Sequence, residues 1–275
     1  MSRLMILSLA FFLSACGRVD QETPARPERP VRIVSLDYCA DQYVLKLVDR
    51  DRILALSPDA GREFSYMRAA AEGVPTVRPN AEDVLILKPD LVVRSYGGGP
   101  NAAAFFEKAG VPVVDIGWTP DIPSVMENTQ RIADALGESE RGAAVNEDMQ
   151  DRLARLKKRS TGETALYMTP AGVTTGPGSL IHEMIVAAGL TNMEDQYGWR
   201  SLPLETLAYE KPDVVAAAFF GSRTNHPDAW SPMKHPVAKA QLTQSEVVSL
   251  EGAWTSCSGW FLMDAIEALA GGETQ

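Results

Sequence analysis

The chain has 275 residues, of which 45% are hydrophobic and 23% are charged, and its formal net charge is −10. This composition is ordinary for a soluble globular protein, and the length allows one large domain or two smaller ones. So acidic a chain is a poor nucleic-acid binder, because it has no excess of Lys and Arg to neutralise phosphates. It contains three His and three Cys, without a CxxC or HExxH pattern. We therefore expect no metal site or cofactor held by protein side chains alone.

The N-terminal residues 1–15 have the layout of a secretory signal peptide. Arg3 precedes an apolar run that is too short to cross a membrane as a stop-transfer helix. The run ends in Leu-Ser-Ala-Cys, which resembles the lipobox of bacterial lipoproteins, so we expect Cys16 to carry lipid. An ordinary secretory signal with a nearby cysteine is the alternative. Residues 16–30 are rich in Pro, Glu and Arg, and they are predicted to form a flexible tether outside the cytoplasm.

The next part of the chain, residues 31–137, alternates short apolar runs with helical patterns. Helices are predicted at residues 41–48, 101–109 and 123–136. Strands are predicted at residues 32–36, 52–56, 91–93 and 111–116. Such alternation predicts an α/β lobe with a parallel sheet and right-handed crossovers.

One segment occurs twice, first as EDVLILKPDLVV from Glu82 and again as ETLAYEKPDVVA from Glu205. In both copies a Glu is followed six residues later by Lys-Pro-Asp and then by a hydrophobic run. Pro disfavours a helical conformation for the residue before it, so each copy reads as a short helix, a tight turn and a buried strand. The copies are roughly 120 residues apart, the size of an ordinary domain. Two lobes of similar design are therefore predicted.

A single long helix is predicted between the two halves, at residues 139–159. Apolar residues form one stripe along it, acids lie near its start, and Lys157, Lys158 and Arg159 match the dipole at its end. The helix would be about 30 Å long. We interpret residues 138–160 as the linker and residues 161–275 as the second lobe, although a long surface helix of one domain is the alternative. Ser179 is predicted to cap the next helix rather than to bind a nucleotide.

Bulky aromatic and arginine side chains follow the predicted strands. In open parallel sheets, ligands bind outside the carboxyl ends of the strands. Two such edges facing each other across a cleft would hold a large, flat or anionic ligand by stacking and charge-assisted hydrogen bonds. The candidate ligand-binding residues are Tyr38, Tyr66, Arg94, Tyr96, Trp118, Phe220, Arg223 and Trp254.

The order of these features resembles the substrate-binding proteins of ABC importers for cobalamin and ferric siderophores. The resemblance rests on the first strand, the Glu82 and Glu205 segments with Lys-Pro-Asp, the long helix and the lipobox, and it covers about residues 32–269. It implies two Rossmann-like α/β lobes joined by one rigid helix, with the ligand in the cleft between them. It also implies that Glu82 and Glu205 dock onto arginines of the membrane permease. A helix-start acid favoured by the macrodipole is the alternative role of each.

The sequence does not decide which ligand is bound. Binding of bare zinc or manganese is not expected, since the clustered His and carboxylates of such relatives are missing. A ferric siderophore would favour the arginines, a cobalamin-like corrinoid the aromatic edges, and haem a tyrosine on iron. In each case the ligand itself brings the iron or cobalt. Cys39 and Cys257 both follow strands, one in each predicted lobe, and an extracytoplasmic location permits a disulfide between them.

Two other functions compete with the capture of a solute by a lipid-anchored monomer that delivers it to an importer permease and its ATPase. An enzyme of the same architecture would need a nucleophile beside a base, or two carboxylates in unequal environments. Its best candidates are His182, His226 and His235, but His182 falls within a predicted helix. The other alternative is a lipoprotein scaffold that binds only proteins. We expect no catalysis.

Overall fold

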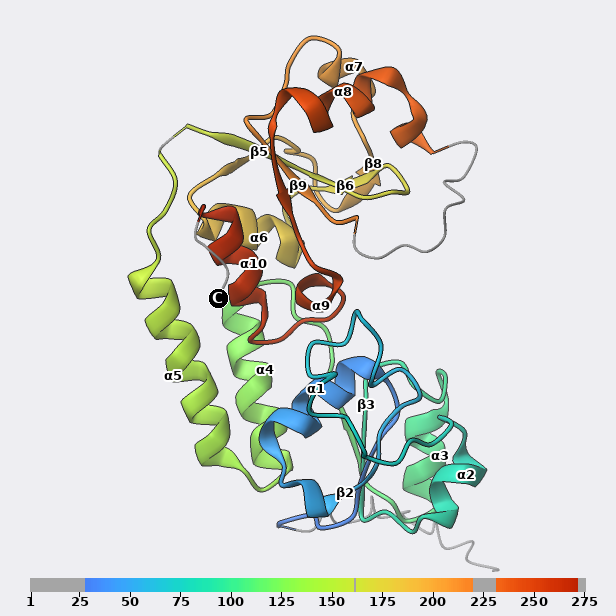
Figure 1. Cartoon of the computed structure of the whole chain (residues 1–275). Coiled ribbons are helices and arrows are strands. Elements are labelled where there is room, and N and C mark those ends of the chain that lie inside the picture. Colours follow the sequence, from blue (N-terminus) through green and yellow to red (C-terminus); the bar gives the residue numbers. More distant parts are fainter. Residues whose placement is uncertain (1–27, 161, 220–230, 272–275) are drawn as a thin grey trace, which may run out of the picture.

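Two lobes, one above the other, are joined along one side by a pair of helices (Figure 1). The computed structural model describes residues 28–160, 162–219 and 231–271. The signal segment, Cys16 and nearly all of the expected tether lie outside these ranges. Within them, no helix combines the length and the apolar character that crossing a bilayer requires.

The first lobe contains a parallel four-stranded sheet in the order β2-β1-β3-β4. Its strands are β1 (Ile33–Ser35), β2 (Ile53–Ala55), β3 (Leu91–Arg94) and β4 (Val113–Asp115). Its helices are α1 (Tyr38–Leu47), the 3-10 turn η1 (Arg50–Arg52), α2 (Ala81–Ile86) and α3 (Ala102–Lys108). The central strands β1 and β3 are buried throughout, as expected of parallel strands covered on both faces.

The second lobe contains a parallel sheet in the order β10-β9-β5-β7 and a separate two-stranded antiparallel sheet. The parallel strands are β5 (Thr164–Met168), β7 (Thr191–Asn192), β9 (Val214–Ala217) and β10 (Glu246–Ser249). The antiparallel strands are β6 (Val173–Thr175) and β8 (Trp199–Ser201), a pair that was not predicted from the sequence. The helices are α6 (Leu180–Ala187), α7 (Leu204–Leu207), η2 (Pro232–Lys234), α8 (Pro236–Gln244), α9 (Gly252–Thr255) and α10 (Leu262–Leu269).

The repeated segment has the same role in both lobes. Each copy leads into the strand that pairs with the first strand of its sheet, β3 beside β1 and β9 beside β5. The Asp of each Lys-Pro-Asp holds the beginning of that first strand. Asp90 accepts hydrogen bonds from the backbone of Val31 and Arg32, both at 2.9 Å, and Asp213 accepts from the backbone nitrogen of Thr164 at 2.8 Å. The prediction of two lobes of similar design is confirmed.

The predicted connector differs from the observed one. Helix α5 (Ser139–Arg155) ends four residues earlier than expected and packs along α4 (Ile122–Ala135), so a helical pair lies beside the junction (Figure 1). The basic residues expected in its last turn belong to the second lobe instead. Arg159 donates to Ala188 through its backbone and forms an ion pair with Glu246 at 2.5 Å. These contacts draw the chain out of the helix from Leu156, whose backbone is extended.

The C-terminal segment returns to the first lobe after β10. A disulfide joins Cys39, in the first turn of α1, to Cys257 just after α9. The hydroxyl of Tyr43 donates to the carbonyl of Ser258 at 3.1 Å, and its ring lies edge-on to Trp260 at 5.5 Å. One continuous cluster of buried apolar side chains includes residues from both lobes. The junction is therefore a packed core with a covalent bond across it, which opposes large hinge motion.

A candidate ligand site at the junction of the lobes

Asp37 organises the carboxyl edge of the first sheet. One of its oxygens caps α1 by accepting from Ala40 at 3.0 Å. The other accepts from three consecutive backbone nitrogens of the loop that follows β3, those of Ser95, Tyr96 and Gly97, at 2.7 to 3.1 Å. The carboxylate is buried, so these bonds form in a low-dielectric environment where each is strong. A single side chain thus fixes the ends of β1 and β3 relative to each other.

Tyr38 and Tyr96 lie together at this edge. Their ring centroids are 6.0 Å apart in an edge-on arrangement, and Tyr38 makes a closer edge contact with Phe64 at 4.7 Å. Tyr96 is 54% exposed, whereas Tyr38 is half-buried. Burial raises the pKa of the Tyr38 phenol, which is therefore neutral near pH 7. The three rings form an aromatic surface with two hydroxyl groups, suited to stacking on a flat ligand.

Arg94 supports this surface from below rather than standing at its rim. It is buried, and its guanidinium donates to the carbonyls of Gly97 at 2.9 Å and Gly99 at 3.1 Å. It also lies 3.4 Å from the Asp115 carboxylate. Gly97 is required here because a Cβ atom would lie 2.4 Å from the Leu36 carbonyl. Arg94 therefore holds the glycine loop that carries Tyr96.

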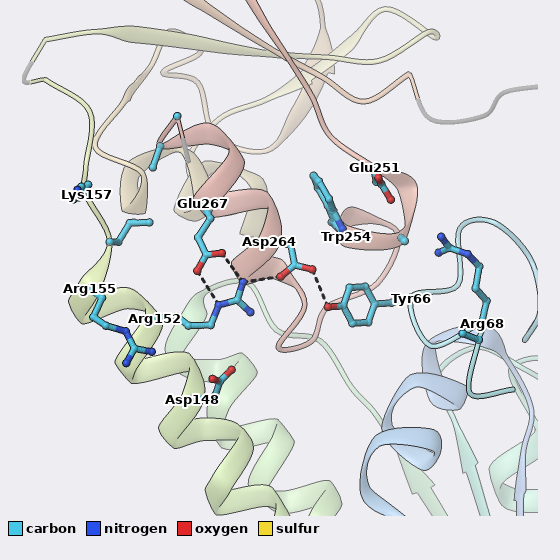
Figure 2. A pocket seen from close by; sticks show the side chains of 15 residues that line it. Tyr66, Arg68, Asp148, Arg152, Arg155, Lys157, Glu251, Trp254, Asp264 and Glu267 are labelled. Carbon is cyan, nitrogen blue, oxygen red and sulfur yellow. Dashed lines mark hydrogen bonds and ion pairs between the residues drawn. The ribbon is translucent and has the colours of Figure 1, made fainter. Parts of the chain in front are cut away.

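Tyr66 and Trp254 line a different hollow, a groove of about 1120 Å³ at the junction (Figure 2). Its walls come from the loop around Tyr66, from the end of α5, and from α9 and α10. Figure 2 shows the hydroxyl of Tyr66 pointing to Asp264, and Arg152 between Asp264 and Glu267. Burial, together with the hydrogen bond to Asp264, raises the pKa of Tyr66, and the two carboxylates raise the pKa of Arg152. Three of the eight charged residues that line this groove, Arg152, Asp264 and Glu267, are thus paired with one another.

Trp118 stands apart from both groups. It follows β4, is 77% exposed, and borders a shallow hollow of about 430 Å³ with Asp115, Glu127 and Arg131. The hydroxyl of Thr119, which is buried in the lining of this hollow, has no hydrogen-bond partner among the described residues. The hollow adjoins the end of β4, and β4 pairs with β3. It therefore lies at the same carboxyl edge of the sheet as Tyr38 and Tyr96, but to one side of them.

The eight candidate residues are therefore only partly assembled. Tyr38 and Tyr96 meet, Tyr66 and Trp254 share the groove, Arg94 is buried beneath the edge, and Trp118 lies to one side. Phe220 and Arg223 lie outside the described residues. Phe64 was not among the residues predicted from the sequence, because it lies in an irregular segment that follows no strand end. Among the described residues, no group of three or more His, Cys, Asp or Glu side chains could hold a metal ion.

The family can be assigned from the sequence itself. The profile of the periplasmic binding proteins matches residues 33–227, more than half of the chain. The chain belongs to this family. Its members are solute-binding proteins located outside the cytoplasm, in agreement with the resemblance stated above. A comparison with curated proteins gives no match.

Solved structures show the same fold at low sequence identity. RhuT, a periplasmic heme-binding protein from Roseiflexus sp. RS-1, has a TM-score of 0.69 and 21% identity, over 87% of this chain and 98% of its own. A periplasmic heme-binding protein from Pseudomonas aeruginosa gives 0.64 and 22%, over 88% and 92%. The vitamin B12-binding protein BtuF of Vibrio cholerae gives 0.63 and 18%, over 89% and 97%. The expected two-lobed α/β fold is confirmed.

Proposed function

We propose that this protein captures a metal chelate at the junction of its lobes and delivers it to the permease of an ABC importer. The observation that carries the proposal is the aromatic surface formed by Tyr38, Phe64 and Tyr96 at the carboxyl edge of the first sheet. Three rings held at one edge offer area for stacking, and two phenols offer oxygen atoms to a metal or to polar groups of the ligand. Structural neighbours that bind heme and vitamin B12 support the same class of ligand.

The metal of such a ligand would arrive inside its organic shell. The described residues offer no cluster that would hold a bare ion, whereas a chelate already satisfies most of the metal's coordination. A tyrosine hydroxyl could then complete the coordination of iron. Tyr38 would have to lose its proton in that step, because burial favours its neutral form. The ligand class is therefore haem, a corrinoid or a ferric siderophore, taken up without chemical turnover.

A lipid anchor and two exposed glutamates would allow attachment to the membrane and delivery to a permease. The Leu-Ser-Ala-Cys sequence supports a lipid anchor at Cys16, which would hold a monomer at the membrane without a spanning helix. Glu82 and Glu205 lie in the first turns of α2 and α7, and both are exposed. Among the described residues neither forms an ion pair, so both are available to cationic groups of a permease. Such charges would act mainly on the rate and orientation of docking.

The proposal is tested by thermal denaturation of the secreted protein with hemin, cyanocobalamin, and ferric hydroxamate or catecholate siderophores, each compared with its metal-free form. A true ligand at a hundred times its dissociation constant adds about 2.7 kcal/mol to the free energy of unfolding. Tyr38→Phe and Tyr96→Phe should weaken binding. Tyr209→Phe is the control, because Tyr209 lies on an exposed turn of the second lobe and not at the carboxyl edge of the first sheet. If none of these chelates stabilises the protein, the proposed ligand class is wrong.

A further inference from the structure

Ile86 and Tyr209 occupy equivalent positions of the repeated segment. Each lies four residues after the Glu of its copy, Glu82 or Glu205. The residue two positions after the Glu is Val84 in one copy and Leu207 in the other, and these side chains are only 0% and 4% exposed. The proline of each Lys-Pro-Asp is buried too. The two copies therefore turn the same side inward and the same side to solvent.

The outward side carries an apolar residue in both lobes. Ile86 is 76% exposed and Tyr209 is 92% exposed. Single exposed apolar residues are common and need no explanation. Here, however, two large ones recur at matching positions of a repeat, where they add nothing to the cores of their lobes. Their exposure is thus a property of both copies and not of one irregular loop.

Each apolar residue is also paired with an exposed acid. Residues four apart on a helix are neighbours on its surface, so Ile86 lies beside Glu82 at the end of α2. In the second copy the helical turn continues past α7, since Ala208 donates to Leu204 and Glu210 to Thr206. Tyr209 is therefore placed beside Glu205 in the same way. Figure 1 shows α2 on the lower lobe and α7 at the top of the upper lobe, both away from the junction.

We propose that Ile86 and Tyr209 are the apolar anchors of a two-point docking surface, one point in each lobe. Each anchor would enter an apolar recess beside a cationic side chain on one of two like halves of the membrane partner. This docking proposal rests on the function proposed above. In it, Ile86 and Tyr209 supply affinity, whereas Glu82 and Glu205 supply orientation. Exposed rim charges contribute little affinity, whereas a buried apolar anchor with water excluded around it contributes much more.

The first test places a photo-crosslinker at each anchor in living cells, as Ile86→p-benzoylphenylalanine and Tyr209→p-benzoylphenylalanine. Both positions should crosslink to the same polytopic membrane protein, identified by mass spectrometry. Phe105 and Val186 provide matched controls, because they are 49% and 47% exposed and lie outside the repeat, one in each lobe. Crosslinker at these two positions should not capture that protein. Adding Glu82→Arg and Glu205→Arg together should abolish the crosslinks.

The second test measures affinity for vesicles that contain the crosslinked membrane protein. Ile86→Ala and Tyr209→Ala should each weaken docking about tenfold, with the affinity for the chelate unchanged. Phe105→Ala and Val186→Ala should dock like the wild type. Different partners at positions 86 and 209, no specific partner, or normal docking of both Ala variants would overturn the inference. The chelate titration separates the two hypotheses, since a protein that binds chelate but docks independently of these residues refutes only the anchors.

Discussion

The hydroxyl of Tyr66 donates a hydrogen bond of 2.8 Å to the carboxylate of Asp264. Tyr66 belongs to the first lobe and Asp264 to the last helix of the chain, 198 residues further on. Arg152 of α5 binds the other oxygen of Asp264 at 2.6 Å, so one carboxylate joins the first lobe, the helical pair and the C-terminal helix. The Tyr66 ring also stacks on Phe261 at 4.9 Å. The lobes are thus held at a fixed angle before any ligand arrives.

Tyr66→Phe tests this link. It removes the hydroxyl and retains the stacked ring, so the free energy of unfolding should fall by about 1.5 kcal/mol, the worth of a hydrogen bond to a charged group. In a double-mutant cycle with Asp264→Asn, chemical denaturation should show coupling of at least about 1 kcal/mol. Tyr209→Phe is the control, because that ring is 92% exposed. Additive effects of the two substitutions would show that the hydrogen bond does not contribute.

Removal of the disulfide should lower the free energy of unfolding more than Tyr66→Phe does. The bond between Cys39 and Cys257 closes a loop of 218 residues and joins α1 to the returning C-terminal segment. Loss of such a crosslink raises the entropy of the unfolded chain, and we expect Cys39→Ser with Cys257→Ser to lower the unfolding free energy by about 3 kcal/mol. Urea denaturation with and without reductant measures the effect. The double variant should be insensitive to reductant. Labelling of both cysteines in the unreduced native protein would contradict the bond.

Asp37→Ala should damage the ligand edge more than the rest of the protein. It leaves the backbone nitrogens of Ala40, Ser95, Tyr96 and Gly97 without their acceptor, at a cost of about 3 kcal/mol. Since these bonds set the spacing of Tyr38 and Tyr96, affinity for the chelate should fall even under conditions where the variant is fully folded. Titration by tryptophan fluorescence, with circular dichroism as the folding check, measures this. Asp37→Asn retains an acceptor oxygen and should lose less.

Much of this arrangement could be predicted from the sequence. The Lys-Pro-Asp repeat indicated two similar lobes, and the rule that parallel strands end at one edge brought Tyr38 and Tyr96 together before any coordinates. Phe64 was not predicted as a site residue because it lies in a long irregular segment, where no periodicity indicates the direction of a side chain. Arg94 was predicted to contact the ligand because it stands at the end of a strand, but it is buried. Its burial depends on the glycine loop folding back over it, which only the close approach of Gly97 to Leu36 reveals.

The C-terminal end of helix α5 could not be predicted from the sequence for a related reason. Residues 156–159 have good helix propensity, and their basic charges suit a helix C-terminus. Tertiary contacts outweigh that preference, since Arg159 donates to the carbonyl of Leu269 and pairs with Glu163 and Glu246. The β6–β8 pair was missed because the residues of β8, Trp-Arg-Ser, are all exposed and give no alternating pattern.

Asp41 gives a pH dependence whose sign can be stated. Its carboxylate is buried, and burial raises its pKa from the ordinary value of 3.8 to about 6, although hydrogen bonds from Ser57 oppose the shift. Between these values the folded protein binds a proton that the unfolded chain has released. The stabilisation is therefore complete below 3.8 and is lost as the pH rises through about 6. From pH 4 to pH 8 this group should lower the unfolding free energy by about 2 kcal/mol.

Asp41→Asn removes the titration and can still accept the backbone bond from Ser57. Denaturation at a series of pH values should give a wild-type curve that falls relative to that of the variant between pH 4 and pH 7, by about 2 kcal/mol. Ser57→Ala sharpens the test, because it removes a 2.6 Å hydrogen bond that favours the charged carboxylate. The fall should then shift to higher pH. Parallel curves for wild type and Asp41→Asn would show that Asp41 does not titrate in this window.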